Sequence, residues 1–550
     1  MASAASPARR PAPQTGPRGL ASEEDVALLP VANPVLLAVG IMTASLIQIL
    51  DSTIANVAIP HMQSSLGATS DEVSWVLTSY IVAVAVAMPI TGWLADRVGS
   101  RRLFIFSVVG FVLSSMLCGM AQNITEMVIF RALQGVTGAF ISPLSQAAMI
   151  DTNKPSRQAQ MMALWGMGIM IGPILGPILG GWLTENWNWR WVFYVNVPLG
   201  AVALLIMLAE LPSRPLVRRK FDLAGFGMVG VMLTSIQLLL DRGNHIDWFA
   251  SAESWIYLFL ALSSGWMAVI HFTTTSNPLF SRALFADPNF MFATFFSVAI
   301  GVVMFATMAL LPPMLQRLFG YGVIDTGEAL MPRGVGTLIS MQFSGYIIRR
   351  GFDPRILIAV GFMIAAGSLW EMAHWSLQTD YWHIASSGFV QGLGMGLVFI
   401  PMNATAFATL PPHLRTDGSS VLNLARSIGS SVGISIVTTF LARNLQIAHS
   451  DLAGKVTASF TQVIDFSTLD RFQSLGEAAL QMIDAEVNRQ AAMIAYIDNF
   501  YMMMWMTLAV IPFTVLMTKP DLRPPGARLN AANDGEESSD EPDGPPDLPH

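Results

Sequence analysis

The sequence predicts an all-α polytopic membrane protein with fourteen spans, arranged as two six-helix bundles plus two extra central helices. The composition, a series of long apolar runs and an internal repeat lead to this fold class. Of the 550 residues, 53% are hydrophobic and 12% are charged. A soluble protein of this size carries roughly 25% charged residues, so a protein that is soluble throughout is excluded.

The apolar runs are long enough to cross a hydrocarbon core of ~30 Å as helices. The first seven lie at 35–59, 73–95, 103–121, 127–149, 160–183, 191–211 and 223–240. The second seven lie at 254–272, 290–312, 326–348, 356–373, 383–409, 421–441 and 497–518. The sequence therefore predicts fourteen spans.

The lysines and arginines predict the orientation, because basic residues are enriched in cytoplasmic segments. With both termini in the cytoplasm, 20 of the 30 basic residues fall in inner segments and seven in outer segments. The remaining three, Arg131, Arg333 and Arg426, lie inside spans. An odd number of spans would mix the inner and outer sets, so we expect both termini to be cytoplasmic.

The expected organisation has five parts. They are a disordered cytoplasmic arm (1–33), an N-terminal six-helix bundle (34–212), two inserted spans (213–273), a C-terminal six-helix bundle (274–520) and a disordered acidic cytoplasmic tail (521–550). A long outer loop, 442–496, separates the last two spans. Its apolar stripe indicates a helix that either caps the membrane surface or docks an external partner.

Two motifs recur at nearly the same distance along the chain. The stretch Gly92–Arg102 (GWLADRVGSRR) has a degenerate echo that begins 253 residues later, at Gly345. The pair Gln134-Gly135 has a counterpart 257 residues later, at Gln391-Gly392. The echoes indicate two duplicated six-span halves with the seventh and eighth spans inserted between them. Such duplication is typical of secondary transporters, whose substrate site lies between the halves.

Several stretches carry a resemblance to a known family, and they cover roughly residues 35–520. They are 50–60, 75–80, 92–102, 189–198, 240–243, 332–334 and 423–426. Together they resemble the major facilitator superfamily, in particular its fourteen-span drug:proton antiporters of EmrB/QacA type. The resemblance implies uphill export driven by proton influx, with alternating access between two bundles. It also implies a bacterial inner-membrane location and, in two-membrane bacteria, a periplasmic adaptor and an outer-membrane channel as partners.

Asp51 is the strongest candidate for chemistry. It lies in an otherwise apolar span, about eight residues or ~12 Å from the outer end. A carboxylate at this depth is costly and usually faces the bundle interior. Arg131, on the oppositely directed fourth span, lies close enough in depth for its long side chain to reach Asp51. We hypothesise that protonation of Asp51 weakens this pairing and shifts the balance between two access states; the alternative is a permanent ion pair or hydrogen-bond anchor.

The fifth span carries a glycine ridge. Gly172, Gly176 and Gly180 form this ridge, and Pro177 and Gly181 complete the same candidate gating motif. Glycines at four-residue intervals share one helix ridge and let a neighbouring backbone approach closely. With Gly166 and Gly168, the ridge resembles the antiporter signature of exporters. It is either a gate or seal in the exchange cycle or a site of simple close packing.

The inner loop between spans two and three is a candidate conformational latch. Its residues are Gly92, Asp96, Arg97, Gly99, Arg101 and Arg102. An acid followed by bases at a helix end can link two bundles and separate as they rock, but positive-inside anchoring explains the arginines equally well. Weaker candidates are Glu328 and Arg333 as a proton site, and Asn423 and Arg426, where snorkelling explains Arg426 about as well.

The predicted substrate is an amphiphilic small molecule, such as a drug or toxic organic compound, exchanged for protons. The chain contains 33 methionines, 31 phenylalanines and 14 tryptophans, whose flexible or flat side chains suit varied apolar guests. Lipid-facing packing explains many of them equally well. The second half has no acid buried as convincingly as Asp51, which weakens a strictly cationic preference. A dedicated exporter of one metabolite, siderophore or lipid is the alternative.

The sequence has no Walker A segment, no HExxH and no cysteine–histidine metal spacing. We therefore expect no enzyme activity, no cofactor and no metal site. No basic patch suggests nucleic acid as a partner.

Overall fold

The computed structural model describes residues 27–217, 219–244, 246–454 and 477–517, and these ranges are almost entirely helical. Thirteen helical stretches are long and apolar enough to cross a membrane. One further helix, α14 (Val323–Arg349), packs against its neighbours like the others but is more polar. All fourteen predicted spans therefore correspond to helices in these ranges.

The first half of the chain forms six spans. Its helices are α1 (Pro34–Leu66), α2 (Ser70–Ala87), α3 (Thr91–Val98), α4 (Ser100–Met120), α5 (Ile124–Gly138), α6 (Ile141–Asp151), α7 (Pro155–Asn186), α8 (Trp191–Tyr194) and α9 (Asn196–Glu210). The second span changes to a 3-10 turn at Met88–Ile90, where Pro89 cannot donate a backbone hydrogen bond. The sixth span is broken between α8 and α9, just before Pro198.

The remaining helices form the inserted pair and the second half. They are α10 (Leu223–Arg242), α11 (Ala252–Thr274), α12 (Arg282–Ala286), α13 (Pro288–Leu318), α14, α15 (Pro354–Met372), α16 (Tyr381–Ala408), α17 (Arg415–Ala453) and α19 (Glu477–Val510). The inserted helices α10 and α11 pack on each other, and α10 also packs on α2 and α17. The inserted pair therefore contacts both halves.

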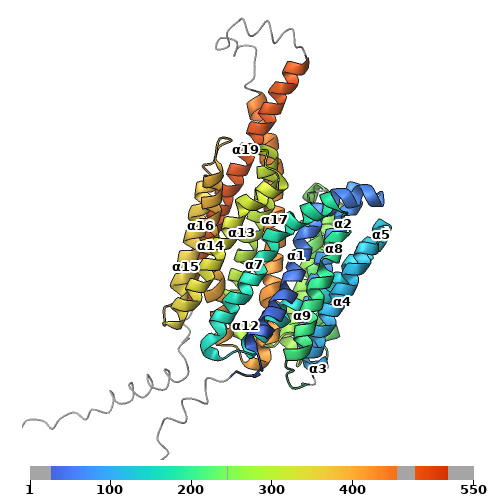
Figure 1. Cartoon of the computed structure of the whole chain (residues 1–550), viewed down its shortest axis with the longest axis vertical. Helices are drawn as coiled ribbons and strands as arrows, with labels where there is room; N and C mark the ends of the chain where they lie inside the picture. Colours follow the sequence, from blue (N-terminus) through green and yellow to red (C-terminus); the bar gives the residue numbers. More distant parts are fainter. Residues whose placement is uncertain (1–26, 218, 245, 455–476, 518–550) are drawn as a thin grey trace, which may run out of the picture.

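The same helix pairing occurs in both halves. Helix α1 packs on α7, α2 on α5 and α4 on α5, while α13 packs on α17, α14 on α16 and α15 on α16. Figure 1 shows the two groups side by side, the first in blue to teal and the second in yellow to orange. Contacts between the groups come from α7 with α14 and from α3 and α6 with α17. This arrangement is the one that the internal repeat predicts.

The last two spans are much longer than the ~20 residues needed to cross a bilayer. Helix α17 has 39 residues and α19 has 34, and the paired ends of the two helices extend beyond the rest of the molecule in Figure 1. The predicted outer loop is thus helical at both ends. Residues 477–496 continue directly into the last span as part of α19, and their role as a surface cap or as a docking site stays a prediction. Residues 455–476 of this loop lie outside the described residues.

The predicted disordered ends fall mostly outside the described ranges. Of the arm, residues 1–26 are not described, and the tail 521–550 is not described at all. The last residues of the arm contact the first half: the amide of Leu29 donates to the carbonyl of Asp151 at 2.9 Å, and the amide of Asn33 donates to the side chain of Glu210 at 3.2 Å. Asn33 also caps the first turn of α1.

Candidate functional site

Asp51 lies on the buried face of α1 and is completely inaccessible to solvent. It accepts hydrogen bonds from Arg131 Nη1 at 2.6 Å, Gln134 Nε2 at 2.9 Å and Asn196 Nδ2 at 2.8 Å. Arg131 occupies one carboxylate oxygen, while Gln134 and Asn196 share the other. The predicted contact between Asp51 and Arg131 is therefore present, and the carboxylate charge is compensated by one cation and two amides.

Arg131 links three helices of the first half. Its side chain is completely buried on α5, and its Nε donates to the carbonyl of Val76 on α2 at 3.1 Å. The guanidinium lies 4.4 Å from the centre of the Tyr80 ring, a cation–π geometry. The second terminal nitrogen of Arg131 has no hydrogen-bond acceptor among the described residues. The positive charge therefore depends mainly on Asp51 for compensation.

The glycine ridge of α7 packs on α1, the helix that carries Asp51. A side chain at Gly176 would overlap Thr53, and one at Gly172 or Gly180 would press on the α1 backbone and on Ile54. Gly181, next along the helix, faces Val323 of α14 in the second half. The ridge thus brings α7 close to α1, and α7 also contacts the other half. Pro177 lies inside the same helix.

At one end of the molecule, Arg219 joins the two halves. It lies in the linker between α9 and α10 and pairs with Asp96 of α3 at 2.8 Å and with Asp417 of α17 at 3.0 Å. A side chain at Gly92 would overlap the Asp417 carboxylate, so a glycine is needed for this approach. Burial alone would lower the pKa of Arg219, but the Asp417 and Asp96 carboxylates raise it, so the guanidinium stays charged.

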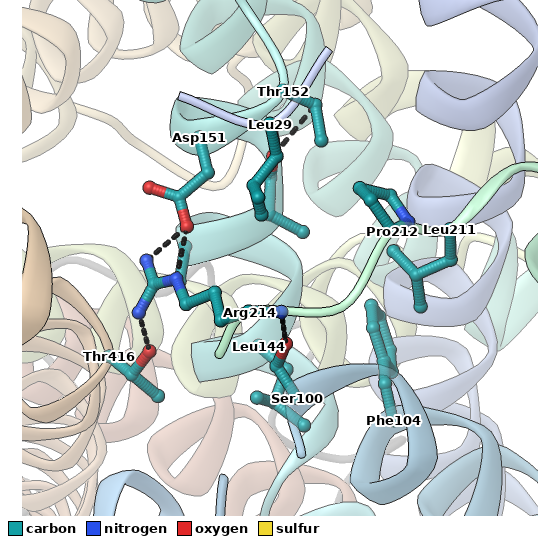
Figure 2. Close-up of a pocket in the computed structure, with 12 residues that line it drawn as sticks. Leu29, Ser100, Phe104, Leu144, Asp151, Thr152, Leu211, Pro212, Arg214 and Thr416 are labelled. Atoms are coloured by element: carbon teal, nitrogen blue, oxygen red, sulfur yellow. Dashed lines mark hydrogen bonds and ion pairs between the residues drawn. The ribbon is translucent and has the colours of Figure 1, made fainter. Parts of the chain in front are cut away.

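A second group of ion pairs is centred on Asp151, and Figure 2 shows its contact with Arg214. Asp151, at the end of α6, pairs with Arg214 of the same linker and with Arg415 of α17 at 3.2 Å. Arg214 also donates to the Thr416 hydroxyl at 2.8 Å. We call the two groups together the inner ion cluster, after the side on which the predicted orientation places them; its charged members are Asp96, Asp151, Arg214, Arg219, Arg415 and Asp417.

The arginines of the predicted latch make their contacts within the first half. Arg101 donates to the carbonyl of Leu208 at 2.6 Å, and Arg97 lies 5.3 Å from the Trp93 ring. Arg102 is exposed. Gly99 has a φ of 99°, a backbone conformation that favours glycine. In the part of the chain that the structure describes, Gly92 thus meets Asp417 of the second half and Asp96 is linked to it through Arg219, whereas the three arginines make no such contact.

The two halves also meet through a buried polar cluster around Gln146 of α6. Its Nε2 donates to Asn403 of α16 at 2.6 Å, and its Oε1 accepts from Ser419 at 2.6 Å and from Asn423 at 2.9 Å. Arg426 hydrogen-bonds Asn423 and lies 5.1 Å from the ring of Phe399. Asn423 is therefore part of the contact between the halves, and Arg426 lies beside it.

Glu328 and Arg333 do not come together. Glu328 is exposed on α14, whereas Arg333, five residues later, is buried and donates to the carbonyl of Met304 on α13 at 3.1 Å. Gln134, Asn196 and the acids Asp151 and Asp417 also belong to the contacts of the site but were not predicted as site residues. Asp151 and Asp417 lie at the ends of spans whose other flanking charges are mostly basic. This pattern in the sequence could have identified the two acids.

Two halves with matching helix pairing, a buried carboxylate–guanidinium pair and ion pairs that join the halves at one end define a multi-pass membrane transporter, not an enzyme. The chain belongs to the Major Facilitator Superfamily, whose sequence model matches residues 41–434. Similarity to the EmrB proteins places it in the EmrB/QacA-type branch of that superfamily.

The chain is 31% identical to multidrug export protein EmrB of Escherichia coli over 475 residues, which cover 86% of this chain and 93% of that protein. It is 36% identical to EmrB of Haemophilus influenzae over 420 residues, or 76% and 82% of the two chains. It is 31% identical to fatty acid resistance protein FarB of Neisseria gonorrhoeae over 482 residues, or 87% and 94%. Among solved structures, the proton:xylose symporter XylE shares the fold with a TM-score of 0.57 at 12% identity, over 91% of this chain and 98% of XylE.

Proposed function

We propose that this protein exports amphiphilic drugs or other toxic organic compounds across the bacterial inner membrane in exchange for protons, by alternating access between its two halves. The names of the bacterial relatives, multidrug export and fatty acid resistance proteins, support the substrate class. The observation that carries the coupling mechanism is the buried Asp51, whose charge is held by Arg131, Gln134 and Asn196.

Protonation of Asp51 is the proposed coupling step. A protonated carboxyl no longer carries the charge that balances Arg131, and an unbalanced guanidinium in the membrane interior is costly. The pair therefore favours one arrangement of the first half when Asp51 is ionised and another when it is protonated. Because the Arg131 side chain also bonds the α2 backbone, a change at Asp51 acts on α1, α2 and α5 together.

The inner ion cluster is the proposed cytoplasmic gate. Its ion pairs join α3, α6, α17 and the linker after α9, and they hold the two halves together at that end. Opening this end requires Arg219 and Arg415 to leave partners on the opposite half. The glycine ridge supports the same cycle, because it lets α7 slide closely on α1 while α7 contacts α14.

The orientation and partners belong to the same proposal. With both termini cytoplasmic, the extended ends of α17 and α19 lie on the periplasmic side. A periplasmic adaptor and an outer-membrane channel would receive the substrate there in a two-membrane bacterium.

The proposal is tested with purified protein in proteoliposomes under an imposed pH gradient, using fluorescent amphiphilic substrates. We expect gradient-dependent transport by the wild type and by an Asp71→Asn control, which changes an exposed acid at the start of α2. We expect Asp51→Asn to lose gradient-dependent transport. Full gradient-driven transport by Asp51→Asn would contradict the role of Asp51, and no transport of any amphiphile by the wild type would contradict the proposed substrate class.

A further inference from the structure

Arg333 is a buried cation without an anionic partner. Among the described residues, five charged residues are less than a tenth exposed when the whole residue is counted: Asp51, Arg131, Asp151, Arg333 and Asp417. Four of them form ion pairs, whereas Arg333 forms none with any described residue. The one hydrogen bond of its side chain goes to a backbone carbonyl, that of Met304. Since a guanidinium does not lose its proton in proteins, this charge persists.

Two further polar groups lie on the helices around Arg333. Thr307, one turn after Met304 on α13, accepts a hydrogen bond from Nε2 of Gln391 on α16 at 3.2 Å. The carbonyl oxygen of Gln391 has no hydrogen-bond partner in the described ranges, although the side chain is completely buried. The second half thus contains a cation, an incompletely bonded amide and a hydroxyl on three adjoining helices.

The internal repeat relates these residues to the Asp51 site. Thr307 lies 256 residues after Asp51, and Gln391 lies 257 residues after Gln134. Gly388 lies 257 residues after Arg131, and Arg333 lies 253 residues after Tyr80. In the second half, therefore, a hydroxyl replaces the carboxylate, and the guanidinium has moved from the equivalent of α5 to the equivalent of α2.

Gly388 lies beside Arg333. A Cβ at Gly388 would lie 3.6 Å from the Cβ of Arg333, an ordinary van der Waals contact, so a side chain at this position would pack against the arginine without a clash. In the first half the corresponding position holds the side chain of Arg131, which Asp51 neutralises. The second half has kept the buried cation of this arrangement but not its counter-charge.

A singly charged organic anion is the ligand that this arrangement fits. An unpaired guanidinium in the membrane interior is costly, so a ligand that brings one negative charge gains an ion pair, whereas a cationic ligand is repelled. A carboxylate matches the planar donor fork of arginine in two parallel hydrogen bonds. Arg426, the other cation inside a span of this half, also has no ion pair among the described residues and hydrogen-bonds Asn423.

We propose that Arg333, with Gln391 and Thr307, binds the head group of a lipophilic carboxylate, and that this carboxylate class is the preferred substrate. The inference rests on the proposed export function, of which it specifies the substrate. It assigns Arg333 to substrate binding, whereas Asp51 and Arg131 serve proton coupling.

The test measures equilibrium binding without a pH gradient. The probes are a dansyl-labelled undecanoate, its methyl ester and the amine of the same chain length, with purified protein in nanodiscs. We expect the wild type to bind the carboxylate at least tenfold more tightly than the ester or the amine. Arg333→Gln should weaken carboxylate binding more than tenfold and ester binding less than twofold, while Arg333→Lys retains part of the preference. Arg317→Gln, which removes an exposed arginine of the same half, is the matched control.

A second pair of variants avoids removing the buried arginine. Gly388→Asp supplies the missing carboxylate beside Arg333, and Gly388→Asn adds the same shape without the charge. We expect Gly388→Asp to raise the melting temperature and to weaken carboxylate binding tenfold, while Gly388→Asn binds the carboxylate nearly as the wild type does. The inference would be overturned if the wild type bound the carboxylate and the ester equally well. It would also be overturned if Gly388→Asp and Gly388→Asn lost the same amount of affinity for the carboxylate. Selective binding without gradient-driven transport would instead contradict the proposed function and leave the anion site intact.

Discussion

The guanidinium of Arg131 lies 2.6 Å from the carboxylate of Asp51, and both side chains are completely buried. The pair connects α1 with α5 inside the first half, and neither charge has access to water in this conformation. Any change in the protonation of Asp51 must therefore be accompanied by a change in the surroundings of Arg131.

The two members of this pair should depend on each other for stability. Removing one partner leaves an uncompensated buried charge, at a cost of about 3–5 kcal/mol, whereas removing both does not. We expect Arg131→Met and Asp51→Leu each to lower stability strongly, and the double variant to be less destabilised than the sum of the two. Thermal unfolding of all four proteins in the same detergent measures this coupling. Additive losses would contradict a pair that is mutually compensating.

The Asp51–Arg131 site could be predicted from the sequence because charged residues are rare in apolar runs. Asp51 and Arg131 could be singled out because each interrupts a long hydrophobic stretch, and the same rarity marked Arg333 and Arg426. Arg214 and Arg219 could not be singled out in this way, because arginines are expected in the cytoplasmic linkers of any such membrane protein. Their pairing with Asp151 and Asp417 becomes visible only when the fold brings α6, α17 and the linker together.

Thirteen of the fourteen spans are marked by apolar length, whereas the more polar α14 could be predicted only together with the charge bias and the internal repeat. The full length of α17 and α19 could not be predicted, because the turns of both helices next to the long loop are polar and carry no hydropathy signal. The repeat by itself shows that Gly388 stands in the place of Arg131, but the position of Arg333 beside Gly388 needs the contact between α14 and α16.

The Gly176 position should tolerate no side chain. A Cβ there would overlap Thr53 of α1, so Gly176→Ala pushes α7 away from the helix that carries Asp51. We expect at least a tenfold loss of transport rate in proteoliposomes, partly restored when Thr53→Ala is added. Gly227→Ala on α10, where a Cβ meets no atom within 4 Å, is the matched control. A normal rate in Gly176→Ala would mean that the close approach is not required.

Loss of Arg219 should open the end of the molecule that holds the inner ion cluster. Arg219 pairs with acids on both halves, and a partly exposed pair contributes up to ~1 kcal/mol. Removing it should therefore shift the ratio of closed to open conformations by about fivefold. The single cysteine, Cys118, can be replaced by alanine, and spin labels at the exposed Arg102 and Phe352 then report the distance between the two halves.

In this experiment we expect Arg219→Gln to increase the population with the longer distance. Lys154→Gln, which removes an exposed base near the same surface, is the control and should leave the distribution unchanged. An unchanged distribution in Arg219→Gln would show that these ion pairs do not hold the halves together.

The central claim is that protonation of Asp51 couples export to the proton gradient. The most direct measurement compares Asp51→Asn with the wild type in proteoliposomes, under an imposed pH gradient and in gradient-free exchange of labelled for unlabelled substrate. The account predicts that the wild type accumulates substrate against its concentration gradient and also exchanges it, whereas Asp51→Asn exchanges substrate but accumulates none. Accumulation by Asp51→Asn at the wild-type level would contradict the account.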